Sequence, residues 1–249
     1  MKISVITVCR DAKVTIVDTL LSVQEQSYSN IEHILIDGDS SDGTADIIRK
    51  HERRLAYWVS EPDQGIYDAM NKGIQQATGD LIGFLNADDM FANNMVLEWI
   101  AKVFSERDIS ACYGDLVYVD HTDLSRIVRY YRSKNFTPAR IACGVMPAHP
   151  TLYLKKDIFK KFGLFKTDYR IAADFEFVAR IFGKQTIQFY YIPRVLVKMR
   201  MGGVSTRSIK SNFILNQEIV RACCENNIPT SLFKVYSKYF RKIFELVQR

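Results

Sequence analysis

The amino-acid sequence predicts an α/β fold, in which helices flank a mainly parallel sheet and further helices follow at the C-terminus. Over residues 3–85, short runs of β-branched apolar residues alternate with segments whose apolar residues recur at helical spacing. Such alternation favours parallel strands, because each helix returns the chain to the same end of the sheet. With 249 residues, 47% of them hydrophobic, the chain can bury a large core without disulfide or metal support.

The first half alternates regularly between the two kinds of element. Strands are expected at residues 3–8, 31–36, 56–60 and 81–85, and helices at 16–26, 45–54 and 65–77. In the third of these helices, Ile66, Met70 and Ile74 fall on one face, as in a helix that packs on a sheet.

The second half is less regular. Strands are expected at 111–113, 116–119, 127–131, 151–154, 187–192 and 195–199, with 116–119 and 127–131 as a hairpin, and a helix at 174–182. We expect residues 1–205 to form one domain, in which residues 1–105 bind one substrate and 106–205 close over it. Residues 206–249 then form a separate helical segment.

Composition excludes several classes of protein. No run approaches 18 apolar residues, and the apolar run before Arg10 is too short for a signal peptide. Five cysteines without a CxxC pair fit a reducing cytoplasm. The net charge is +6, of which +5 lies in residues 206–249. The nearly neutral body carries no nucleic-acid-binding motif, so nucleic acid is not an expected partner.

Three predicted strands end in polar or acidic loops, at residues 9–11, 37–44 and 86–89. The carboxyl ends of parallel strands meet at one edge, where ligands bind. Asp88 and Asp89 directly follow an apolar strand. A Mg²⁺ or Mn²⁺ ion would offset their negative charge, and the phosphates of a substrate would complete the coordination of the ion. Helix capping by either aspartate is the alternative. The chain has no P-loop motif, which excludes a P-loop nucleotidase.

The segments ILIDGDSSDGT, EPDQGIYDAMNKGI and FLNADD, together with the first strand, resemble successive signatures of the family 2 glycosyltransferases. The resemblance covers residues 1–205. It implies the Rossmann-like GT-A fold and the inverting transfer of a sugar from a nucleotide diphosphate sugar, UDP-sugar being favoured, usually with Mn²⁺ or Mg²⁺. The subset that it resembles builds bacterial capsule, O-antigen or exopolysaccharide.

The same resemblance implies a donor site. Asp37 matches the aspartate that hydrogen-bonds the nucleobase, and Thr7 and Arg10 lie at the strand end that touches the nucleotide. Asp63 and Asn71 fall where the family contacts the nucleotide or the sugar.

The metal-binding motif departs from the family's DxD pattern. In Asn86-Ala87-Asp88, the last residue matches the metal and diphosphate ligand, and Asp89 stands beside it as a second candidate ligand. Asn86 can still hydrogen-bond a ribose hydroxyl but is a weaker metal ligand than aspartate.

Asp174 begins the helix predicted at 174–182 and matches the position of the family's catalytic base. An inverting transfer needs such a base, because the acceptor hydroxyl loses its proton as it attacks. From local sequence alone, a helix N-cap is the alternative. Glu176 is the fallback base and is otherwise expected to be a solvated helix residue.

Two further segments are candidates for the donor site. Arg200 could pair with phosphate, and Gly202 and Gly203 allow close approach of the backbone. The family has a similar segment that closes over the diphosphate, while a hinge is the alternative. His149 matches a histidine of the subset that faces donor or acceptor, and a structural histidine is the alternative.

Residues 230–249 predict a basic amphipathic helix rich in aromatic residues. Such helices bind anionic membrane surfaces. We therefore expect a cytoplasmic protein at the inner face of the cell membrane, where it would meet a lipid-linked or saccharide acceptor. A helix packed on the body is the alternative. The sequence does not indicate the oligomeric state.

Two other functions compete with glycosyl transfer. A sugar-nucleotide nucleotidyltransferase would need a glycine-rich loop after the first strand, and residues 9–13 contain no glycine. A non-catalytic nucleotide-sugar-binding subunit of a polysaccharide-assembly complex is favoured only by Asn86.

Overall fold

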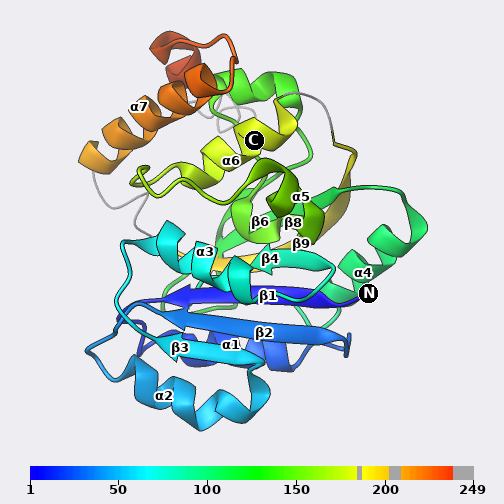
Figure 1. The fold of residues 1–249 in the computed structure, drawn as a ribbon, viewed down its shortest axis with the longest axis vertical. Helices are drawn as coiled ribbons and strands as arrows, with labels where there is room; N and C mark the ends of the chain where they lie inside the picture. The colour runs from blue at the N-terminus through cyan, green and yellow to red at the C-terminus, as the bar shows by residue number, and fades with distance from the viewer. Residues whose placement is uncertain (184–186, 202–208, 238–249) are drawn as a thin grey trace.

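The computed structural model describes residues 1–183, 187–201 and 209–237 (Figure 1). The strands within these residues are β1 (Ile3–Cys9), β2 (Ile31–Asp37), β3 (Tyr57–Ser60), β4 (Leu81–Phe84), β5 (Asp89–Phe91), β6 (Ala111–Val119), β7 (Ile127–Tyr131), β8 (Tyr153–Lys155) and β9 (Phe189–Arg200). The helices are α1 (Ile16–Gln24), α2 (Thr44–His51), α3 (Ile66–Gln76), α4 (Val96–Glu106), α5 (Lys156–Phe162), α6 (Ala173–Phe182) and α7 (Ile209–Glu225). Short 3₁₀ helices lie at Glu52–Arg54, Pro138–Cys143 and His149–Thr151.

One mixed sheet runs through the molecule in the order β3-β2-β1-β4-β8-β6-β9-β5, and β7 pairs with β6. The strands β1 to β4 are parallel, and Figure 1 shows their arrows pointing the same way. Antiparallel β8 then joins β4 to β6, which in turn runs parallel to β9. The α/β prediction is therefore confirmed, as is the hairpin of 116–119 with 127–131.

Helices cover both faces of this sheet, which explains why β1 is buried along its whole length. On one face α3, α5 and α6 pack in the largest apolar cluster, together with side chains of β1 and β2. On the other face α1, α2 and α4 complete two smaller clusters. Among the described residues, no helix combines the length and apolar character needed to span a bilayer.

The helix α7 shares the largest cluster rather than standing apart from it. Its residues Ile219, Ala222 and Cys223 are buried there with Val235, and Figure 1 shows α7 lying across α6. The domain boundary predicted between residues 205 and 206 falls within 202–208, outside the described residues.

Two strands are continuous where the sequence predicts a break. The strand β6 passes through Gly114, where a Cβ atom would stand 2.6 Å from Cγ of Leu196 on β9, so only glycine lets the strands approach. The strand β9 passes through Pro193, and its pairing with β6 shifts register between Tyr113 and Asp115. The irregular pairing accommodates both residues.

Candidate active site

The parallel strands bring the predicted polar loops to one edge. The register aligns Cys9 of β1 with Asp37 of β2, and Asp37 with Ser60 of β3. Each of these residues is the last of its strand. The loops that follow these strands therefore start side by side, as the sequence predicts for the loops at 9–11 and 37–44.

Asp37 is fully buried and its carboxylate is engaged by protein donors. Oδ1 accepts from Sγ of Cys9 at 3.2 Å and from Oγ of Ser40 at 2.5 Å. Oδ2 accepts from the Ser40 amide at 3.1 Å and from Oγ of Ser60 at 2.6 Å. Asp37 thus joins the ends of three strands and shapes the loop that follows β2.

A different carboxylate occupies the space above Gly38. A Cβ atom built on Gly38 would lie 2.2 Å from Oδ2 of Asp63, so Asp63 covers this glycine. The other oxygen of Asp63 accepts from the Gly65 amide at 2.8 Å, which holds the side chain in place. Asp63 is half-exposed, and so presents a carboxylate at the edge where Asp37 does not.

Two of the predicted donor residues make structural contacts. Thr7 is fully buried, with its hydroxyl 2.9 Å from Nε2 of His33. Burial lowers the pKa of His33 to about 4, so this imidazole is neutral. Asn71 hydrogen-bonds both backbone groups of Phe165, at 2.8 and 3.0 Å, and links α3 to the second half of the chain. Arg10 is exposed directly after β1.

The loop after β4 carries the candidate metal ligands. Asp88 is half-exposed, while Asp89 is fully buried at the start of β5. Both carboxylate oxygens of Asp89 and Oδ1 of Asn86 are buried without a hydrogen-bond partner among the described residues. Burial and the neighbouring charge of Asp88 raise the pKa of Asp89 well above its usual value. Ala87 is buried against α1 and α2.

Arg200 ties this loop to the rest of the site. Its buried guanidinium donates to the Asp88 carbonyl at 3.3 Å and pairs with Asp18 of α1. Arg200 therefore makes structural contacts beside the aspartates of this loop, and its pairing with phosphate stays a prediction. Gly202 and Gly203 lie outside the described residues.

Asp174 lies in the first turn of α6, half-exposed. The N-cap residue is Ala172 rather than Asp174, but Oδ1 of Asp174 accepts from the Phe175 amide at 2.8 Å, so Asp174 also stabilises the start of the helix. Oδ1 of Asp174 accepts from the Tyr67 hydroxyl at 3.2 Å, and that hydroxyl also lies 2.5 Å from the Ile171 carbonyl. Sequence reasoning missed Tyr67, because its contact with Asp174 joins residues 107 positions apart.

Two neighbours of Asp174 have different roles. His149 stacks on Phe84, with ring centroids 5.4 Å apart, and burial lowers its pKa while the charge of Asp174 opposes that shift. Glu176 is fully buried and paired with Arg180 at 2.6 Å and Lys166 at 3.2 Å. The expectation that Glu176 is solvated is wrong, because these two cations compensate its burial.

Comparisons with known proteins identify similar sequences and similar folds. The family model described as glycosyl transferase family 2 matches residues 4–163. An uncharacterized glycosyltransferase of Mycobacterium tuberculosis is 34% identical over 185 residues, which are 72% of this chain and 68% of the relative. A PGL/p-HBAD biosynthesis glycosyltransferase of Mycobacterium bovis is 29% identical over 197 residues, or 78% of this chain and 75% of the relative.

Solved structures share the fold. That of S. aureus TarS 1–349 in complex with UDP-GlcNAc superposes with a TM-score of 0.71 at 18% identity, covering 89% of this chain and 66% of that one. The mannosyltransferase PcManGT of Pyrobaculum calidifontis, in complex with GDP-Man and Mn²⁺, gives 0.65 at 19% identity, covering 90% and 63%. At these identities the likeness concerns the GT-A fold.

Proposed function

The chain belongs to glycosyl transferase family 2, and we propose that it is an inverting, metal-dependent enzyme that moves a sugar from a UDP-sugar to a lipid-linked or saccharide acceptor. Membership of the family makes the chain a glycosyltransferase and sets the nucleotidyltransferase alternative aside. Its relatives include enzymes named for glycolipid and teichuronic acid biosynthesis, which supports an acceptor in the assembly of a cell-surface glycan.

The nucleotide would bind at the ends of β1 and β2. Asp63 offers the base or ribose a half-exposed carboxylate, and Arg10 is exposed directly after β1. The UDP-GlcNAc complex named for TarS supports UDP as the first donor nucleotide to test.

The residues after β4 fit a divalent cation. Asn86 and Asp89 contribute buried oxygens that receive no hydrogen bond from the described residues, and Asp88 is half-exposed in the same loop. The described residues hold no group of three or more His, Cys, Asp or Glu placed to bind a metal, so a bound ion would need substrate phosphates to complete its coordination. When bound, Mn²⁺ or Mg²⁺ would offset the charge that develops on the leaving diphosphate.

Asp174 would act as the catalytic base. The acceptor oxygen forms its bond to the anomeric carbon as the bond to the diphosphate oxygen breaks, and the acceptor proton passes to the Asp174 carboxylate. The bonding electron pair leaves with the nucleoside diphosphate. Tyr67 orients Asp174 through its hydroxyl, and His149, packed on Phe84, forms part of the wall nearby.

One observation carries this proposal: the hydrogen bond from Tyr67 to Asp174. Tyr67 belongs to α3, which follows the loop of Asp63, while Asp174 belongs to α6 in the second half. The contact therefore joins the candidate base to the half of the chain in which we propose that the nucleotide binds, and this supports the proposal.

The test replaces the two acidic groups separately, as Asp174→Asn and Asp88→Asn. Each should lower the rate of UDP release with UDP-sugar and acceptor by about 10²–10⁴-fold, because each removes a group needed in the transition state. The thermal midpoint should stay unchanged, and Asp157→Asn, an exposed aspartate of α5, is the matched control. Wild-type turnover in Asp174→Asn would remove the base from the mechanism.

The C-terminal segment would hold the enzyme at the cytoplasmic face of the membrane. Its described part exposes Phe233 by 82% and Leu232 by 47%, although Val235 is buried in the core. Apolar side chains beside basic residues favour an anionic lipid surface.

A further inference from the structure

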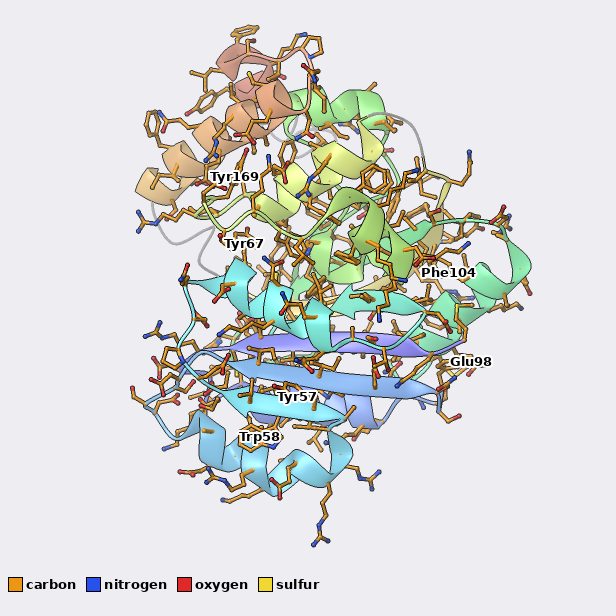
Figure 2. All side chains as sticks on the ribbon, viewed as in Figure 1. Tyr57, Trp58, Tyr67, Glu98, Phe104 and Tyr169 are labelled. Carbon is orange, nitrogen blue, oxygen red and sulfur yellow. The ribbon has the colours of Figure 1, made fainter. Side chains whose placement is uncertain are left out.

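A cavity of about 300 Å³ lies beside the candidate base, and its described lining includes none of Arg10, Asp63 and Asp88. Its inner wall is the first turn of α3 with the preceding loop, including Gln64, Ile66 and Tyr67. The outer wall is the segment 167–170. In Figure 2, Tyr67 marks the α3 side of this cavity, and Tyr169 marks the segment on its other side, next to α7.

We propose that this cavity receives a sugar unit of the acceptor. The inference rests on the proposed function, because it takes Asp174 as the base. A base must lie next to the hydroxyl that it deprotonates. Tyr67 lines the cavity and hydrogen-bonds Asp174, so the cavity opens within one side chain of the carboxylate.

The chemistry of the wall suits a sugar. Ile66 is exposed by 44% and offers an apolar surface, while the side chains of Gln64, Thr167 and Arg170 are exposed and polar. Sugars present both apolar C–H faces and hydroxyl groups, so a small cavity with mixed walls can bind one. The volume is at the lower end for ligand pockets, which favours a single sugar unit.

The outer wall is held rigid by α7. Glu218 accepts from the backbone amides of Arg170 at 2.7 Å and of Ile171 and Ala172 at 2.9 Å each. The guanidinium of Arg221 pairs with Asp168 and lies 4.2 Å from the centre of the Tyr169 ring. A wall fixed in this way is preorganised, which lowers the entropic cost of binding.

Methyl-labelled protein provides the test. The full chain, labelled with ¹³C at isoleucine δ1 methyl groups and saturated with UDP and Mn²⁺, is titrated with methyl glycosides of glucose, galactose, mannose, N-acetylglucosamine and rhamnose. We expect a saturable shift of the Ile66 methyl signal, assigned with Ile66→Val, for at least one glycoside. If no glycoside shifts this signal, or if a UDP-sugar competes with the glycoside for it, the cavity is not an acceptor site.

A kinetic arm separates this proposal from the proposed function. With the glycoside that binds, Ile66→Trp should raise the acceptor KM about tenfold or more, because the larger ring fills the cavity. The donor KM should stay within about twofold of the wild-type value. The control Leu21→Trp, on the exposed side of α1, should leave both KM values within the same range. A rise in donor KM would overturn the acceptor assignment. Failure of the wild type to bind any UDP-sugar by calorimetry would instead remove the proposed function.

Discussion

Asp37 and Asp63 divide two tasks at the end of β2. The carboxylate of Asp37 accepts hydrogen bonds that hold three strand ends together. Asp63 presents its half-exposed carboxylate above Gly38. A glycine at position 38 makes this possible, because any side chain there would collide with Asp63. Under the proposed function, recognition of the nucleotide would therefore fall to Asp63, which lies 26 positions after Asp37 in the sequence.

Replacing these two aspartates should give opposite results. Asp63→Ala should weaken UDP binding about 10- to 100-fold with little effect on stability, because a hydrogen bond to a charged group contributes about 1.5–3 kcal/mol. Asp37→Ala should instead lower the free energy of unfolding by about 3 kcal/mol, since it leaves buried donors unpaired. Calorimetric titration with UDP and urea unfolding measure the two effects. UDP binding by Asp63→Ala at wild-type affinity would contradict the role of Asp63.

His33 gives the fold a dependence on pH. Burial lowers its pKa from 6.5 to about 4, so the unfolded chain takes up the proton first as the pH falls. Stability should therefore decline from about pH 6.5 down to about pH 4, by about 3 kcal/mol in all. Urea unfolding at a series of pH values should show this slope for the wild type and a shallower one for His33→Gln, which cannot titrate. Parallel curves for the two proteins would show that the slope has another source.

At the scale of helices and strands, how well the sequence predicted an element depended on whether its contacts lie nearby or far away in the sequence. The strands β1, β2 and β4 were predicted to within about a residue, because strands covered on both faces are continuous apolar runs. Gly114 and Pro193 led to predicted breaks in β6 and β9, since only pairing across the sheet shows that the strands continue. The contacts of Tyr67 and Glu218 were not predictable, because their partners lie far away in the sequence.

The helix α7 is expected to affect catalysis indirectly, because Glu218 positions the backbone that precedes Asp174. Glu218→Ala leaves three backbone amides without their acceptor and frees the segment that precedes Asp174. A shift of about 1 Å at the base can lower kcat about 100-fold, while donor binding is unaffected. Steady-state kinetics should show lower kcat at unchanged donor KM, with partial recovery in Glu218→Gln.

The control for this effect is Gln217→Ala, which changes an exposed neighbour on the same helix. It should retain the wild-type kcat. Equal loss in both variants, or a fall in thermal midpoint that parallels the loss of activity, would show that α7 serves stability alone.

At the scale of the whole molecule, most of the net positive charge lies in the C-terminal part, together with several exposed aromatic side chains. Residues 206–249 carry +5 of the net charge of +6. In the described residues of this part, Phe213 on α7 is exposed by 53% and Phe233 by 82%. Val235 is buried in the core, and the Thr230 hydroxyl donates to the Ala142 carbonyl, so removal of residues 230–249 would also disturb the body.

A single substitution therefore tests membrane binding more cleanly than a truncation. Phe233→Asp should weaken sedimentation with phosphatidylglycerol vesicles about 10- to 100-fold, because inserting a Phe side chain into an apolar phase contributes about 1.5–3 kcal/mol. Binding of the wild type should also fall with added salt, since the basic residues act through a screened field. Val128→Asp, at a residue of β7 exposed by 50%, is the matched control and should bind as the wild type does. Equal binding of all three proteins would leave the C-terminal part with the alternative role of packing on the body, to which Val235 already contributes.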